Sequence, residues 1–177
     1  MNRRKFLITA GATAAIGASL TASAEDVDAN AMGALGDGVT DDSDALQRSI
    51  EAAAETGGAV LLSAGTYRLS RTLFLDVVDS DVAIVGAGAE ATVLRIEGEE
   101  GDPALWIGPD PASAPAYVAI AGLRVESTGT TTESTLVGEI GIVVGAVGGI
   151  AFEDMVFADL DGNQHSTVSG VAEVSFS

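Results

Sequence analysis

The chain of 177 residues contains no cysteine, a single histidine and few aromatic side chains. The absence of cysteine excludes disulfides, thiolate metal sites, cysteine nucleophiles and a lipid-modified amino-terminal cysteine. One histidine without cysteine leaves no ligand set for a transition metal. With 5% aromatic residues but 22 glycines and 47% hydrophobic residues, the composition favours a repetitive β architecture over a core built around aromatic side chains.

Positive charge is also scarce. The chain has 8 Lys and Arg residues against 26 Asp and Glu, and three of the eight are Arg3, Arg4 and Lys5. Beyond them, five arginines face 26 acids, a net charge of 5 − 26 = −21. This balance favours a halophilic protein, because salt screens the repulsion; an ordinary acidic extracellular protein is the alternative. No basic patch is present to neutralise phosphates, so we expect no nucleic-acid partner.

The first 24 residues have the features of an export signal rather than of a folded domain. A twin-arginine start is followed by a mildly apolar stretch from Ile8 to Leu20 and by a small-residue cleavage site at Ala22-Ser23-Ala24. The apolar stretch is too short and too rich in Gly, Ala and Thr for a membrane anchor. We predict export by the twin-arginine route to the extracellular space or cell surface, and one domain over residues 25–177.

A short helix is predicted from about Ser43 to Glu55. Asp41 and Asp42 precede it, and an acid at the N-cap accepts hydrogen bonds from the free amides of the first turn. Gly57 ends it, as glycine does where φ turns positive. The apolar positions recur at helical spacing, at Leu46, Ile50, Ala53 and Ala54. Such a helix can cover the open apolar end of a stack of β coils.

Short strands and turns follow, and a repeat appears once gaps are allowed. Strands are predicted at residues 59–62, 67–69, 72–75, 82–85 and 92–96, with a turn at Gly86-Ala87-Gly88. Apolar residues at offsets 0, 2, 5 and 7 then occur twice, 32 residues apart, at Val118, Ile120, Leu123 and Val125 and at Ile150, Phe152, Met155 and Phe157. Each set predicts two strands joined by a tight corner, with both apolar pairs pointing inward. Residues 101–115 and 127–135 are predicted to be loops that leave the coil.

Two stretches carry a resemblance to a known family. The run from Gly36-Asp37-Gly38-Val39-Thr40 to Gln47 leads through the helix to the run from Gly57-Gly58 to Gly65-Thr66-Tyr67. Both closely resemble the start of pectate-lyase-superfamily proteins, over about residues 30–98, and the coil rhythm alone continues over 116–160. The resemblance implies an all-β fold, a right-handed parallel β-helix with a short amino-terminal capping α-helix, and polysaccharide as the partner.

The last residues repeat the start of another coil. Val174 and Phe176 have the spacing of the first two apolar positions of the repeat. The sequence stops at Ser177, before the corner that would follow them. A β-helix ended there exposes unpaired backbone groups and an apolar cross-section, which natural proteins cover. We expect this sequence to be truncated, the amino-terminal part of a longer protein. A small complete protein that self-associates through the open carboxy-terminal coil is the alternative.

Candidate catalytic residues are few. Lyase chemistry on uronates needs a cation beside the substrate carboxylate and a base for the adjacent proton. Arg124 should point outward from its strand, although a surface ion pair with Glu126 is its simpler role. Hydrolysis needs two carboxylates about 5 to 10 Å apart. The outward acids late in the chain are the candidates for that pair: Glu153, Asp154, Asp159 and Asp161.

No motif in this sequence matches the catalytic residues of the family, so the resemblance implies no catalytic residue here. No cofactor is evident, and calcium is implied by the resemblance alone. Residues 159–163 lack the glycine and glutamate spacing of a calcium-hand loop and indicate a polar turn, and His165 is predicted to be a loop residue. Three functions stay open: a polysaccharide lyase or glycoside hydrolase, a non-catalytic glycan-binding or cell-surface β-helix, and an inactive fragment of a longer enzyme.

Overall fold

The computed structural model describes residues 26–76, 80–97, 103–108, 117–127, 142–144, 149–158, 166–168 and 174–176. The predicted export signal lies outside these ranges, as does the predicted loop at 127–135 except for Ser127, which ends a strand. Among the described residues, no helix has the length and apolar character needed to cross a membrane.

The described ranges hold one helix, α1 (Ser43–Thr56), and thirteen strands. The strands are β1 (Val27–Asp28), β2 (Asp37–Asp41), β3 (Ala59–Leu61), β4 (Gly65–Leu69), β5 (Leu73–Leu75), β6 (Val82–Val85), β7 (Thr92–Ile96), β8 (Leu105–Ile107), β9 (Tyr117–Ser127), β10 (Ile142–Val144), β11 (Gly149–Ala158), β12 (Ser166–Val168) and β13 (Val174–Phe176). Every pairing between these strands is parallel.

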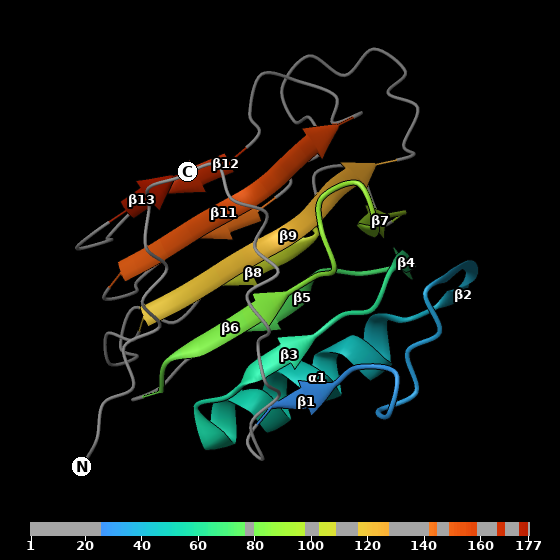
Figure 1. The fold of residues 1–177 in the computed structure, drawn as a ribbon, viewed down its shortest axis with the longest axis horizontal. Helices are drawn as coiled ribbons and strands as arrows, with labels where there is room; N and C mark the ends of the chain where they lie inside the picture. The colour runs from blue at the N-terminus through green and yellow to red at the C-terminus, as the bar shows by residue number, and fades with distance from the viewer. Residues whose placement is uncertain are drawn as a thin grey trace.

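The strands stack in three faces. The first face runs β1-β3-β6-β9-β11-β13, the second β2-β4-β7-β9-β11, and the third β5-β8-β10-β12. The long strands β9 and β11 cross from the first face to the second through a corner, so each coil adds one layer to every face. Figure 1 shows β3, β6, β9 and β11 side by side as one such face. This topology confirms the predicted all-β parallel β-helix.

The apolar repeat lines the inside of the stack, as predicted. Val118, Ile120, Leu123 and Val125 are at most 1% exposed. The parallel register places Ile150 on Val118, Phe152 on Ile120 and Met155 on Leu123. A single buried cluster therefore runs through the coils, because each inward position meets its equivalent one layer away.

The helix α1 covers the amino-terminal end of the stack, below β3 and β5 in Figure 1. Its apolar stripe packs into the strand core: Leu46 is 2%, Ile50 3% and Ala53 0% exposed. It ends at Gly57, whose φ of 70° lies in the left-handed region. The predicted capping helix is thus confirmed, together with its stop signal.

The start of α1 differs from the prediction. Asp42 makes no side-chain hydrogen bond to the helix. Its carboxylate is buried, at 1% exposed, and accepts hydrogen bonds from the Leu35 amide at 2.7 Å and the Gly36 amide at 3.1 Å. The Ser43 amide donates instead to Asp41 at 3.0 Å. Two amide donors offset the cost of burying a carboxylate, so Asp42 fastens the entry loop against the helix.

The third face corrects the predicted coil. Residues 101–115 were expected to be a loop, but Leu105–Ile107 within them form β8, which pairs with β5 and β10. The strands β10 and β12, at residues 142–144 and 166–168, were likewise not predicted. Three residues are too few to display an alternating pattern. A coil therefore has three strands rather than the two that the repeat indicated.

Neighbouring coils approach most closely at the corner between the first two faces. A Cβ atom on Gly86 would lie 2.2 Å from the carbonyl oxygen of Gly122, and one on Gly122 would lie 2.8 Å from the carbonyl oxygen of Gly86. The Gly86 amide donates to Ala121 at 2.9 Å and the Gly88 amide to Gly122 at 2.9 Å. The predicted Gly86-Ala87-Gly88 turn is confirmed, and its glycines allow two backbones to touch.

We predict that Gly122→Ala destabilises the fold by about 2–3 kcal/mol, because the added methyl group meets backbone rather than a movable side chain. Gly57→Ala is the matched control: its φ is 70° against 64° at Gly122, but its nearest neighbour would be 3.6 Å away. The control should lose only about 1 kcal/mol, the cost of the left-handed backbone. Urea denaturation measures both, and equal losses would refute the close approach.

A second prediction concerns the stability of the fold at low pH. The Asp41 carboxylate accepts hydrogen bonds from the Ser43 hydroxyl at 2.6 Å and from the Ser70 hydroxyl, which joins the start of α1 to the end of β4. Partial desolvation is the largest single influence and raises the pKa of Asp41, but the hydrogen bonds from Ser43 and Ser70 together outweigh it and lower the pKa to about 2.

A lowered pKa means that the charged form stabilises the fold above the unfolded pKa of 3.8, and that this stabilisation disappears as pH falls toward 2. Solvent screens the exposed carboxylate, so we expect a contribution of about 1 kcal/mol. Asp41→Asn should unfold more easily than the parent at pH 6, and the difference should shrink as pH falls through about 2, as judged by thermal melts. A constant difference at all pH values would contradict the assignment.

Candidate functional site

The outer surface of the second face gathers most of the positive charge of the folded part. Arg68 on β4, Arg95 on β7 and Glu126 on β9 follow one another in the register of the stack. Arg124, two residues before Glu126, lies in register with Val93 on the neighbouring coil. Three of the five arginines beyond residue 25 thus occupy one face. We call Arg68, Arg95 and Arg124 the arginine row.

Each member of the arginine row pairs with a carboxylate. Arg95 lies 2.7 Å from Glu126, with the two side chains 30% and 14% exposed. Arg68 pairs with Glu97, and the hydrogen bond from Arg68 to Glu97 is the main reason that the pKa of Arg68 is raised. These acids offset the repulsion between arginines that stack directly on one another.

The partner of Arg124 is a correction to the sequence analysis. Arg124 lies 3.3 Å from Glu90, whereas Glu126, its expected partner, pairs with Arg95. Glu90 belongs to the turn between β6 and β7, one coil away, and its side chain is 86% exposed. Sequence reasoning missed Glu90, although the Gly86-Ala87-Gly88 turn just before it marked a place where coils meet.

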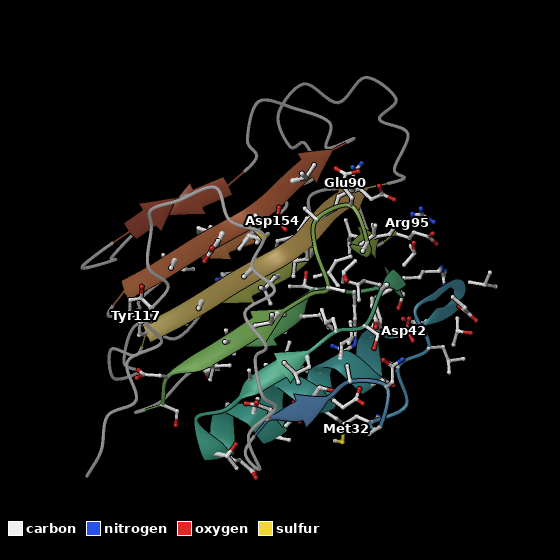
Figure 2. The ribbon with its side chains drawn as sticks, in the orientation of Figure 1. Met32, Asp42, Glu90, Arg95, Tyr117 and Asp154 are labelled. Carbon is white, nitrogen blue, oxygen red and sulfur yellow. The ribbon has the colours of Figure 1, made fainter. Side chains whose placement is uncertain are left out.

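Asp154 reaches the same turn from the other side. It has a φ of 49° at the corner of β11, where the preceding coil has Gly122 with a φ of 64°. Its carboxylate accepts a hydrogen bond from the Ala89 amide at 3.1 Å. The turn thus contacts Asp154 through the Ala89 amide and Arg124 through the adjacent Glu90. Figure 2 shows Asp154, Glu90 and Arg95 along the same side of the stack.

The remaining predicted site residues are not brought together. Glu153 lies on the first face in register with Ala121, as predicted, and is partly exposed. No acid therefore stacks beside it on the preceding coil. Asp159, Asp161 and His165 lie outside the described residues.

Within the part of the chain that the structure describes, no three His, Cys, Asp or Glu side chains converge on a metal position. The described residues offer no cluster of ligands for a calcium ion, and calcium stays a prediction from the resemblance. The turn offers different chemistry: a guanidinium that can hold a carboxylate, and two carboxylates that can accept protons. It is open to solvent, which suits a long chain lying across the surface.

The Asp154 side chain can stabilise the corner of β11, accept a proton in a reaction, or do both, and substitutions separate these roles. Asp and Asn tolerate the left-handed backbone better than Ala. We predict that Asp154→Asn keeps stability within about 0.5 kcal/mol, whereas Asp154→Ala loses about 1–2 kcal/mol with the backbone preference and the hydrogen bond to Ala89. Thermal melts test this. Equal stability of both variants would show that the corner does not depend on this side chain.

Comparison with known proteins gives one family match and several similar proteins. Residues 27–111 match the family described as rhamnogalacturonase A/epimerase, pectate lyase-like. Mannuronan C5-epimerase AlgE5 of Azotobacter vinelandii is 45% identical over 76 residues, which are 40% of this chain and 8% of that protein. Alginate lyase 7 of the same organism is 45% identical over 70 residues, 37% of this chain and 8% of that protein.

Among solved structures, the surface adhesin PfbA of Streptococcus pneumoniae superposes with a TM-score of 0.66. The match covers 85% of this chain and 37% of the adhesin, at 18% sequence identity. That identity supports likeness of fold alone. The chain thus spans a small part of the length of the curated relatives and under half of this structural one. The chain is thus similar over residues 27–111 to the pectate-lyase-like family, and its three-faced parallel coils are the β-helix fold.

Proposed function

We propose that this chain is part of an exported protein that acts on an acidic polysaccharide, a polyuronate, held along the second face by the arginine row. One observation carries the proposal. In a chain of 26 acids, three of the five arginines beyond residue 25 are placed on successive coils of one face. A face that collects scarce cations suits a polyanion.

The spacing of the arginine row fits a polymer. Arg68 and Arg95 are in register on neighbouring parallel strands, which lie about 4.8 Å apart, so their guanidinium groups can meet carboxylates that recur along a chain of uronate units. Arginine binds carboxylates through two parallel hydrogen bonds. An exposed ion pair contributes at most about 1 kcal/mol. Glu90, which is 86% exposed, can therefore leave Arg124 at little cost when a substrate carboxylate arrives.

The proposed reaction class is proton removal beside a uronate carboxylate. A carboxylate at the turn, Glu90 or Asp154, takes the C5 proton, and Arg124 neutralises the substrate carboxylate as charge develops on it. Elimination then breaks the C4–O bond and leaves a C4=C5 double bond, and the departing oxygen takes a proton from solvent water. Epimerisation instead returns a proton from water to the opposite side of C5. The names of the two alginate-active relatives, an epimerase and a lyase, support this class.

The proposal includes export to the extracellular space or cell surface. The twin-arginine start and the small-residue cleavage site support it. The acidic balance supports a high-salt environment. A non-catalytic glycan-binding protein is the second candidate, and the solvent-open turn favours it, because catalytic centres usually exclude water.

Binding to polymannuronate tests the proposal. By isothermal titration calorimetry of the full chain at low salt, Arg124→Gln and Arg95→Gln should each weaken binding about tenfold, since each loses a charge-assisted hydrogen bond. Arg48→Gln is the control: its guanidinium donates to the Met32 carbonyl oxygen, beside α1, and affinity should not change. Added salt should weaken binding by the parent chain.

The reaction class is tested with the same preparations. Absorbance of the unsaturated product detects elimination, and NMR of the polymer detects epimerisation. Binding without either product would favour the glycan-binding candidate. Absence of binding to any polyuronate, or equal loss in the Arg48→Gln control, would refute the role of the arginine row.

A further inference from the structure

An exposed aromatic pair lies on the third face, away from the arginine row. Phe74 on β5 and Trp106 on β8 are in register on neighbouring coils. Their ring centroids are 6.0 Å apart with planes tilted by 31°. Phe74 is 41% and Trp106 38% exposed. Trp106 is the only tryptophan of a chain with 5% aromatic residues, so its place on the surface calls for a partner.

A cavity of about 380 Å³ opens beside Phe74, between α1 and the third face. This volume lies within the range of small-ligand sites. Its wall combines apolar surface with a few hydrogen-bonding groups, as such sites do. The lining residues are Gln47, Ile50, Glu51, Ala54, Arg71, Phe74 and Asp76.

The cavity wall is fixed by hydrogen bonds. The Gln47 side chain accepts from the Phe74 amide at 2.9 Å and donates to the Phe74 carbonyl oxygen at 3.0 Å. Gln47 also donates to Glu51 at 3.1 Å. These two hydrogen bonds hold β5 against α1 and fix the position of the Phe74 ring beside the opening. A preformed wall lowers the ordering cost of binding.

The charge around the cavity selects against a polyuronate. Glu51 and Asp76 line it, and its one cation, Arg71, lies 2.8 Å from Asp44. The lining thus has two acids to one cation, whereas the arginine row has one acid to each guanidinium and gains an excess of positive charge once Glu90 is displaced. A ligand without charge avoids this repulsion, and its hydroxyl groups can hydrogen-bond to carboxylates and to the exposed side of Arg71.

We propose that this aromatic groove, formed by the cavity and the Phe74–Trp106 pair, binds a neutral oligosaccharide. The apolar C–H side of a sugar ring packs on an aromatic face while its hydroxyls meet the polar lining. Coils are about 4.8 Å apart, close to the length of one pyranose unit, so consecutive units reach Phe74 and Trp106. The groove would anchor the protein on a neutral glycan while the second face holds an acidic one.

Tryptophan fluorescence of the full chain tests this directly, because the signal comes from Trp106 alone. We expect a saturable change when cellohexaose, mannohexaose or laminarihexaose is added, and no change with an oligomannuronate of the same length. Phe74→Ala should weaken the binding about tenfold, and Phe74→Tyr should restore it because the ring is kept.

Val39→Ala removes a more exposed apolar side chain, 78% exposed on β2, and should bind like the parent. Unchanged thermal melts for all three variants keep folding separate from binding. The groove proposal is overturned if no neutral hexasaccharide in the panel changes fluorescence, if Phe74→Ala binds like the parent, or if only the uronate changes the signal. Phe74→Ala should leave polymannuronate binding intact, so failure here is distinct from failure of the arginine row.

Discussion

Parallel backbone pairing between coils is the constraint on which the rest of this structure depends. Each strand pairs with its equivalent one coil away, so the side chain at any position lies beside the same position of the next coil. Inside the stack this produces a continuous apolar core. Outside it, any residue type that recurs becomes a row. The stacking of Arg68 on Arg95 and the Phe74–Trp106 pair are both consequences of this single register, whereas Arg124 lies on the same face two residues out of it.

The parallel pairing also restricts which residues can occupy the corners. Gly86 and Gly122 are needed because two backbones come into contact there, and Asp154 continues the corner in the next coil with a left-handed backbone. The same corner carries the turn that presents Glu90 to Arg124. Structure and candidate chemistry thus share one feature, because the point of closest approach is also where side chains from three coils can meet.

Two surfaces of the stack differ in the chemistry that they offer. The second face presents guanidinium groups with exchangeable acid partners, and the third face presents aromatic rings beside an acidic cavity. A solenoid keeps such surfaces apart and rigid, because each face is a separate sheet. Under the two proposals, one coil stack would engage an acidic polysaccharide on one face and a neutral one on another.

The sequence by itself determined the coil rhythm, the capping helix with its glycine stop, and the inward positions, because these depend on local periodicity and backbone preference. It also gave Arg124 and Asp154 as candidate site residues. Only the tertiary structure decided the third-face strands β8, β10 and β12, which are too short for a pattern, and the partners of charged side chains. Arg124 meets Glu90 rather than Glu126, and Asp42 holds Leu35 and Gly36 rather than the helix amides. Those partners lie on other coils or loops, and their distance along the chain carries no information about distance in space.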